Sequence, residues 1–399
     1  MNVLVLHSRY STGPSSGENR VVADEVALLR AHGHEVAAWS PDPPAGTAVE
    51  RAALGARAVW SRAAVARVRT LAAELRPDVI HVHNLYPMLS PAVLRTTAAP
   101  VVVTLHNYRL MCLPATFLRD GRTCEDCLGH APWRGVVHRC YRGSAAGSAS
   151  LAAAIALHRR LGSFRRVARF LAVSEFVRDK HIEAGIEPGR IAVKPNFVDP
   201  LPRREGPGDY FLFLGRLSPE KGVATLVEAW RDIPARLVVV GDGEERARLA
   251  AIAPATVEFH DAVPADRVGD YLARARALVV PSIWYEGSPR TITEAYAAGV
   301  PVIASRCGAL PGVVADGVTG VLAEPGDAES WRAAVRRLLD DETSAQIGER
   351  AFGVWRSGYS PERGIVDLED AYGAVIGRTT GGNTPSGRGQ LEGTGGRRA

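Results

Sequence analysis

The sequence predicts an α/β protein with two doubly wound parallel sheets, one in each of two domains. The chain has 399 residues, which is too long for one comfortable hydrophobic core. Short apolar segments alternate with Ala-, Leu- and Arg-rich segments of helical spacing almost throughout, as in parallel sheets covered on both faces. A stretch rich in Pro, Gly and Arg at 196–208 separates two such series and is interpreted as a linker.

The first series forms an expected domain over residues 1–195. Between its apolar segments, helical spacing predicts helices over 18–31 and 62–75. The opening segment is apolar but lacks a basic leading region and a small-residue cleavage site, so it is interpreted as a strand and not as a signal peptide. The expected strands cover 3–6, 35–39, 78–83, 101–106, 170–174 and 190–194.

The second series forms an expected domain over residues 209–358, with late helices over 330–339 and 343–357. A last helix within 359–376 is expected to pack back on the first domain. The tail over 377–399 holds almost nothing apolar, so we expect it to be disordered. The expected strands cover 210–215, 235–241, 256–260, 277–282, 301–305 and 320–324.

The composition excludes several classes of protein. No run of about 18 uncharged apolar residues occurs, so no membrane-spanning helix is expected and a cytoplasmic location is predicted. A net charge of +5 is too small for this length to indicate nucleic-acid binding. The basic stretch over 158–170 suits peripheral contact with an anionic membrane or a surface helix covering the first sheet, and we prefer the second interpretation.

The most informative motif, EGSPRTITE, begins at Glu286 and links an expected strand to a helix. Ser288 suits the N-cap, Pro289 the first helical position, and Gly299 the position just after the helix. Backbone N–H groups at such a helix start bind anionic phosphate. Glu294 lies about 7.5 Å along the helix axis, at 1.5 Å per residue. Two carboxylates that far apart can accept hydrogen bonds from two separate sets of hydroxyls.

A second motif, GRLSPEKG, starts at Gly215 directly after an expected strand. Ligands of open parallel sheets bind at the carboxyl ends of the strands. Arg216 can fork onto phosphate oxygens, and Lys221 supplies a compact charge. Alone, such a turn is interpreted as a solvated basic loop. The expected helix start at Pro289 offers a second phosphate contact in the same domain and favours a diphosphate site.

Together these residues resemble the signature of the retaining glycosyltransferase family 4, of the GT-B fold, over roughly residues 1–376. The resemblance implies two facing Rossmann-like domains with a cleft between them, and a nucleotide sugar held by the second domain. It implies that Glu286 contacts donor-sugar hydroxyls, that Glu294 binds the ribose, and that Arg216 and Lys221 hold the diphosphate. The donor-binding residues expected on this basis are Gly17, Gly215, Arg216, Lys221, Glu286, Gly287, Ser288, Pro289 and Glu294.

Two departures from the family pattern stand out. The family usually has a Gly-Gly pair near the first helix and a glycine after the linker asparagine, where this chain has Ser16 and Phe197. Gly17 still permits close backbone approach to a ligand. Glu18 and Asn19, which follow it, are expected to face the acceptor.

His106 ends the expected strand over 101–106, so its side chain should reach the cleft. The resemblance implies that it hydrogen-bonds the donor sugar, and that the catalytic group is His106, Glu286, Arg216 and Lys221. Asn107 and Arg109 are expected to be acceptor-side companions. A structural, hydrogen-bonding histidine is the alternative.

The resemblance implies retention at the anomeric carbon, with the leaving phosphate taking the acceptor proton and no protein nucleophile. The expected donor is a UDP- or GDP-sugar, and the acceptor is a hydroxyl of a polysaccharide, a lipid-linked glycan or a secondary metabolite. The cleft loops hold no DxD-type acidic pair, so no cofactor or metal is expected in catalysis. The alternatives are a non-catalytic nucleotide-sugar-binding protein and an NAD-dependent oxidoreductase. The second is disfavoured because Arg246 stands where G-x-G-x-x-G requires its third glycine.

An insert over 107–143 holds four cysteines in the spacing C-x11-C-x2-C-x12-C. The spacing suits a structural zinc site with four thiolate ligands, which would order a segment with little core of its own. Four reduced thiols, a redox disulfide and an iron–sulfur cluster are the alternatives. The insert lies beside His106 in sequence and is expected to shape the acceptor pocket. The candidate ligands are Cys112, Cys124, Cys127 and Cys140.

Overall fold

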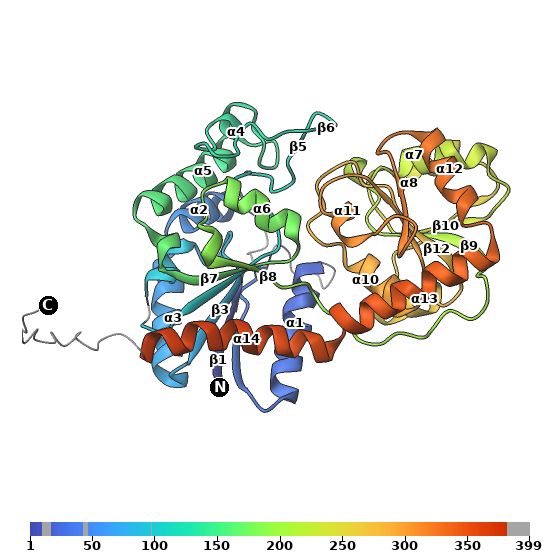
Figure 1. Cartoon of the computed structure of the whole chain (residues 1–399). Helices are drawn as coiled ribbons and strands as arrows, with labels where there is room; N and C mark the ends of the chain where they lie inside the picture. The colour runs from blue at the N-terminus through green and yellow to red at the C-terminus, as the bar shows by residue number, and fades with distance from the viewer. Residues whose placement is uncertain (10–16, 43–46, 97, 381–399) are drawn as a thin grey trace, which may run out of the picture.

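The computed structural model describes residues 1–9, 17–42, 47–96 and 98–380, which form two α/β domains side by side (Figure 1). Ser16 and the tail from residue 381 lie outside these residues. Residues 377–380 belong to the last helix, so the expectation of disorder is wrong for that part of the tail. No helix among the described residues combines the length and the apolar character that a membrane span needs.

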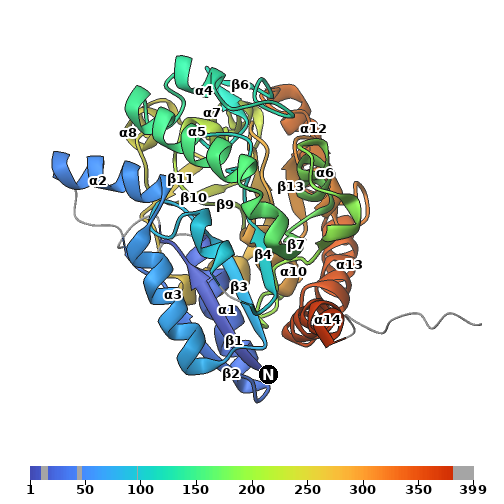
Figure 2. The ribbon, with the colours of Figure 1, turned by 90° about the vertical axis from the view of Figure 1, so that its left-hand side faces the viewer.

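The first domain contains a six-stranded parallel sheet in the order β2-β1-β3-β4-β7-β8. Figure 2 shows helices on both faces of this sheet. One face packs on α1 and α14, and the other on α2, α3 and α5. The strands are β1 (Asn2–His7), β2 (Glu35–Trp39), β3 (Val79–Asn84), β4 (Val101–Leu105), β7 (Val167–Ala172) and β8 (Ile191–Val193). The helices are α1 (Gly17–Ala31), α2 (Ala48–Val59), α3 (Arg62–Leu75), α5 (Ala145–Arg160) and α6 (Glu175–Glu183).

The second domain repeats the plan with a parallel sheet in the order β11-β10-β9-β12-β13-β14. Its strands are almost entirely apolar, as expected for strands buried on both faces. The strands are β9 (Tyr210–Leu214), β10 (Leu237–Val240), β11 (Val257–His260), β12 (Ala275–Val280), β13 (Val302–Ser305) and β14 (Gly320–Ala323). The helices are α7 (Val223–Ala229), α8 (Arg246–Ile252), α9 (Val268–Leu272), α10 (Arg290–Ala297), α11 (Leu310–Val313), α12 (Ala328–Arg337) and α13 (Asp341–Gly358).

The segment over 158–170 is not one amphipathic helix. It contains the end of α5, a 3₁₀ turn (Ser163–Arg166) and the start of β7. Gly162 has a φ of 66°, which ends the helical course of the chain. Arg165 and Arg166 are exposed, whereas His158 is buried and lies 2.9 Å from the Val59 carbonyl oxygen. This segment therefore joins α5 to the sheet.

The chain crosses between the domains twice, and the two crossing segments lie side by side. The N–H of Val198 donates to the Tyr359 carbonyl oxygen (3.0 Å), and Trp355 Nε1 donates to the Val198 carbonyl (3.0 Å). After the second crossing, α14 (Pro361–Thr380) runs along the first domain (Figure 1) and buries Leu368 and Tyr372 against its sheet.

Phe197 fills the space at this crossover. It is 4% exposed and packs in the same cluster as α14. A Cβ atom on Gly364 would come within 2.7 Å of the Phe197 ring. The ring that replaces the family's glycine thus lies in the core between the linker and α14.

Candidate functional site

The carboxyl ends of the two sheets face each other around the loop that follows β12. Ser174 Oγ, after β7, donates to the Gly287 carbonyl oxygen at 2.7 Å, and Tyr108, after β4, donates to the Glu286 carbonyl at 3.3 Å. A Cβ atom on Gly287 would lie 3.1 Å from the His106 carbonyl oxygen. The structure therefore brings together His106 and the Glu286 loop, which are 180 positions apart in the chain.

Glu286 is held by three donors that converge on one carboxylate oxygen. Its Oε1 accepts from Lys221 Nζ (2.6 Å), Ser282 Oγ (2.7 Å) and Trp284 Nε1 (3.0 Å), and the residue is 6% exposed. Among the described residues no donor reaches Oε2 of the same carboxylate. A fixed carboxylate with one oxygen left over can accept a hydrogen bond from a ligand hydroxyl.

Lys221 is placed against Glu286 by the turn that follows it. Gly222 has a φ of 68°, and a Cβ atom there would lie 2.1 Å from the Pro281 carbonyl oxygen. Only glycine permits this approach of the two loops. Gly215, by contrast, is simply the residue directly after β9.

Arg216 lies on the open side of the same loop. It donates to Glu220 Oε1 at 2.8 Å, and its side chain is 67% exposed. The structure does not bring it into contact with Lys221 or Glu286. An exposed arginine on a surface ion pair keeps the freedom to turn toward a ligand.

The start of α10 differs from the predicted cap. Ser288 and Pro289 lie in the approach to the helix, which begins at Arg290. Pro289 has the N-cap position, so the prediction of Ser288 as N-cap is wrong by one residue. No side chain caps this terminus. Its first N–H groups therefore lack the partner that a serine hydroxyl would supply, which suits anion binding.

Glu294 forms part of an ion-pair network that joins the two domains. Arg290 Nε donates to Glu294 Oε1 (2.9 Å), and Arg290 Nη1 lies 2.7 Å from Asp24 Oδ2 on α1. All three side chains are at most 15% exposed. Burial raises the pKa of Glu294, although Arg290 opposes the shift. Neither Arg290 nor Asp24 was predicted as a site residue, although Arg290 lies inside the EGSPRTITE motif.

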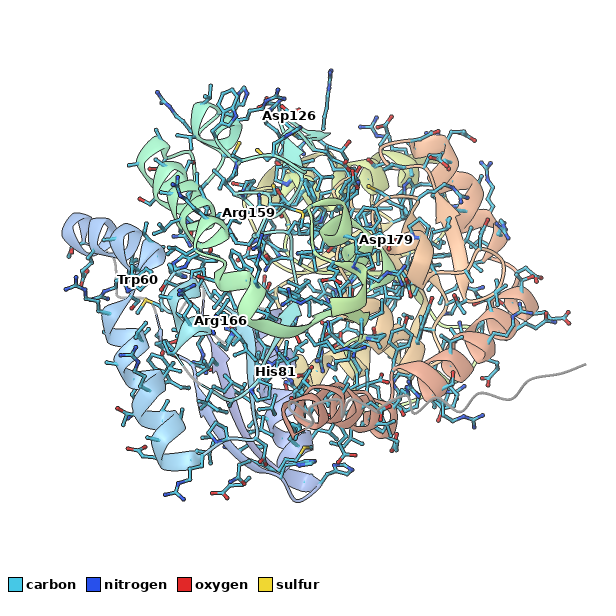
Figure 3. All side chains as sticks on the ribbon, turned by 60° about the vertical axis from the view of Figure 1, so that its left-hand side comes forward. Trp60, His81, Asp126, Arg159, Arg166 and Asp179 are labelled. Carbon is cyan, nitrogen blue, oxygen red and sulfur yellow. The ribbon has the colours of Figure 1, made fainter. Side chains whose placement is uncertain are left out.

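A cluster of buried histidines lies beneath His106 and was not predicted. His81 and His83 are two positions apart on β3 and therefore point to one face of the sheet. His83 Nδ1 lies 3.0 Å from His106 Nε2. His81, labelled beside α14 in Figure 3, lies 2.8 Å from the Tyr372 hydroxyl. Burial lowers the pKa of His106 to about 3, against the influence of Glu25, so the imidazole is neutral.

The expected acceptor-side residues divide into two groups. Asn107 Nδ2 donates to Glu18 Oε1 at 2.6 Å, and Asn19 Oδ1 lies 2.7 Å from His7 Nε2, so these residues connect α1 with the ends of β1 and β4. Gly17 is exposed and begins α1. Arg109 instead points into the insert, where it donates to the Leu113 carbonyl oxygen and lies over the Tyr141 ring.

The cysteine insert is built from a two-stranded hairpin, β5 (Leu118–Arg119) with β6 (Arg122–Thr123), and from α4 (Arg134–Val137). In Figure 3, Asp126 lies on this insert and Arg159 on α5 below it. Arg159 connects α5 to the insert by donating hydrogen bonds to the Leu110 and His130 carbonyl oxygens. Within the insert, Phe117 packs on Tyr285, the residue before Glu286. The insert thus borders the Glu286 loop.

The four insert cysteines are free thiols, and no three of their sulfurs lie within 4.8 Å of one another. Sulfurs around a tetrahedral zinc lie about 3.8 Å apart, given Zn–S distances near 2.3 Å. Among the described residues, only Glu25, His81 and His83 bring three metal-binding atoms within 4.8 Å of one another. Burial raises the pKa of Cys112 to about 11, although the backbone of Phe117, Thr116 and Ala115 opposes the shift. The zinc site stays a prediction.

Comparisons with known proteins identify relatives of both domains. Residues 15–200 match the model of Glycosyltransferase Family 4, and residues 200–353 match that of Glycosyl transferases group 1. The chain is 30% identical over 324 residues to 2-deoxystreptamine glucosyltransferase of Streptomyces kanamyceticus, a match that covers 76% of this chain and 78% of that protein.

Two solved structures share the fold. Anabaena HepE in complex with UDP aligns with a TM-score of 0.64 at 20% identity, over 94% of this chain and 100% of that one. Sucrose-phosphate synthase of Thermosynechococcus elongatus aligns with a TM-score of 0.71 at 19% identity, over 95% of this chain and 100% of that one. The two parallel-sheet domains accordingly have the predicted GT-B arrangement.

Proposed function

The chain belongs to the glycosyltransferase family 4, glycosyl transferases group 1, and on that premise we propose that it moves a sugar from a UDP-sugar to an acceptor hydroxyl with retention at the anomeric carbon. The observation that carries the proposal is the Lys221–Glu286 pair, 2.6 Å apart, beside the uncapped start of α10 and next to His106. A cation and a fixed carboxylate are thus paired between the loops that follow β9 and β12, and the second of these loops leads into α10.

The diphosphate of the donor binds between Lys221 and the start of α10. Both supply positive charge at the carboxyl ends of β9 and β12, where charge on the leaving diphosphate develops. Arg216, exposed on the same loop, turns inward to add a forked contact. These groups neutralise the leaving group with no metal required.

Glu286 binds the donor sugar through the carboxylate oxygen that Lys221 leaves unused. Glu294 accepts from the ribose hydroxyls, and its contact with Arg290 holds its side chain in place. The neutral imidazole of His106 lies over the sugar and binds it. In this arrangement no side chain acts as a covalent nucleophile, and the leaving phosphate takes the acceptor proton.

The UDP preference is supported by HepE, whose structure contains UDP, and the acceptor is a hydroxyl of unspecified class. Since the relative from Streptomyces kanamyceticus is a 2-deoxystreptamine glucosyltransferase, an aminocyclitol belongs in the acceptor panel beside glycans and lipid-linked sugars. The residues Glu18, Asn19 and Asn107 would contact this acceptor.

A donor screen tests the proposal. At about 100 times its dissociation constant, a bound UDP-sugar stabilises the folded chain by about 2.7 kcal/mol, which a thermal-shift scan detects. The donor that shifts the melting temperature is then incubated with the acceptor panel, and NMR of the product reports the anomeric configuration. Glu286→Gln is the matched control and should lose transfer. Failure of every UDP-sugar to bind, or an inverted product, contradicts the proposal.

A further inference from the structure

A chain of buried polar side chains runs from the interior of the first domain to His106. Lys194 Nζ bonds Glu25 Oε1, Glu25 Oε2 lies 3.5 Å from His83 Nε2, and His83 Nδ1 lies 3.0 Å from His106 Nε2. The side chains of Lys194, Glu25 and His83 are at most 2% exposed. Because these groups are out of contact with solvent, the protonation state of each depends on the charges and hydrogen bonds of its neighbours in this chain.

The same cluster has the spacing of a metal site, but its charges are already balanced. Glu25, His81 and His83 offer three ligand atoms within 4.8 Å. However, the Lys194 ammonium neutralises Glu25, and both nitrogens of His81 lie within 2.8 Å of a hydroxyl group. What remains is Glu25 Oε2 facing His83 Nε2 at 3.5 Å, two buried atoms without a hydrogen bond, while His81 Nδ1 lies farther from the same oxygen at 3.8 Å. A proton between these two atoms satisfies both.

The charge on Glu25 decides where that proton lies. Burial alone would raise the pKa of Glu25, but Lys194 and His81 outweigh it and hold the carboxyl ionised. Burial lowers the pKa of His83 well below its ordinary value, so this ring carries one proton. A nitrogen lone pair facing a carboxylate is repelled, so the proton is on Nε2. His83 Nδ1 then accepts, and His106 must donate from Nε2.

We propose that Glu25 and His83 are positioning residues that hold His106 in its Nε2–H tautomer, so that Nδ1 presents a lone pair to the substrate. The inference rests on the proposed function and names what the histidine recognises. Among the described residues His106 Nδ1 has no hydrogen-bond partner, and the His106 backbone contacts Gly287 beside Glu286. A lone pair accepts from a sugar hydroxyl and repels a carboxylate. The site therefore takes a neutral hexose in preference to the matching uronate.

NMR on the intact chain tests the tautomer directly. With ¹⁵N-labelled histidine, long-range proton–nitrogen correlations distinguish the two ring nitrogens, and His106→Gln identifies the signals of His106. We expect an unprotonated Nδ1 and a protonated Nε2 in the free enzyme. A protonated Nδ1 overturns the proposal, whatever the chain proves to catalyse.

Two substitutions of His83 test the consequence for turnover. His83→Leu removes the acceptor for His106, whereas His83→Asn keeps a side-chain oxygen near the position of Nδ1. We expect His83→Leu to lower kcat by about tenfold or more with little change in KM for the donor, and His83→Asn to keep most of the activity. The preference for UDP-glucose over UDP-glucuronate should shrink in His83→Leu.

Controls separate this inference from the proposed function. UDP affinity, measured by calorimetry, should be the same in wild type, His83→Leu and His83→Asn, since the proposed diphosphate site lies in the second domain and His83 lies in the first. Equal kcat in the two His83 variants refutes the positioning role. If the wild-type chain binds no nucleotide and transfers no sugar, the proposed function fails, and the NMR result still decides the tautomer.

Discussion

Replacing Lys221 by methionine removes the ammonium that faces Glu286 and should affect both folding and turnover. Glu286 is 7% exposed in its side chain and Lys221 is 22% exposed. Breaking a fully buried pair costs 3–5 kcal/mol. Here Ser282 and Trp284 still donate to the carboxylate, so we expect a loss of about 2 kcal/mol of unfolding free energy. Activity should fall by roughly 10²- to 10³-fold, because the diphosphate loses its fixed cation.

The double variant separates the two effects. In Lys221→Met/Glu286→Gln no charge is left buried, so stability should return to within about 0.5 kcal/mol of wild type while activity stays lost. Urea unfolding followed by fluorescence measures the first quantity, and UDP release measures the second. Arg236→Met is the matched control, since its ion pair with Glu258 is exposed and should contribute less than about 1 kcal/mol. Wild-type stability or activity in Lys221→Met refutes the reasoning.

Three further predictions concern the insert, the crossover and the histidines. Metal analysis of purified protein should find about one zinc per chain, lost in Cys127→Ser; a metal-free chain with four reactive insert thiols contradicts the zinc site. Gly364→Ala should destabilise the chain by about 1–3 kcal/mol, because its methyl group would meet the Phe197 ring at 2.7 Å, and Gly373→Ala, with open space around its Cβ, is the control. The pKa of His106 is lowered to about 3, so the unfolded chain binds the extra proton first, and stability should fall as the pH drops from 6.5 toward 3. His106→Gln should reduce the slope of the unfolding free energy against pH in this range by up to about 1.4 kcal/mol per pH unit. If the slope is the same in wild type and variant, His106 is not a buried neutral imidazole.

The strands were predictable because each is a short apolar run bounded by polar, Gly or Pro residues, and all twelve expected strands are present. The helices α2 and α5 were not predicted. In α5, Gly147, Ser148 and Ser150 weaken the local preference for helix, and burial of Leu151 and Ile155 overrides it. The cap of α10 was misplaced because Pro289, with φ −66° and ψ 118°, fits the N-cap as well as the first turn.

The site was predictable where its residues belong to one loop and not where it depends on how elements meet. Glu286 and Lys221 come from motifs that each follow a strand. The histidine cluster forms because β1, β3 and β4 are neighbours in the sheet, and the spacing of histidines in the chain does not reveal that order. The contact of Arg290 with Asp24 depends on how the two domains face each other, which no local pattern encodes.

The return of α14 to the first domain constrains how this protein emerges from the ribosome. The sheet of that domain is complete at β8, yet Val3, Val5 and Leu171 lie in a cluster that α1 covers in part and that α14 completes. About 170 residues separate the two, which takes roughly 10–30 s to translate. During that interval the second domain is being synthesised, and the nascent first domain exposes the apolar side chains that α14 later covers.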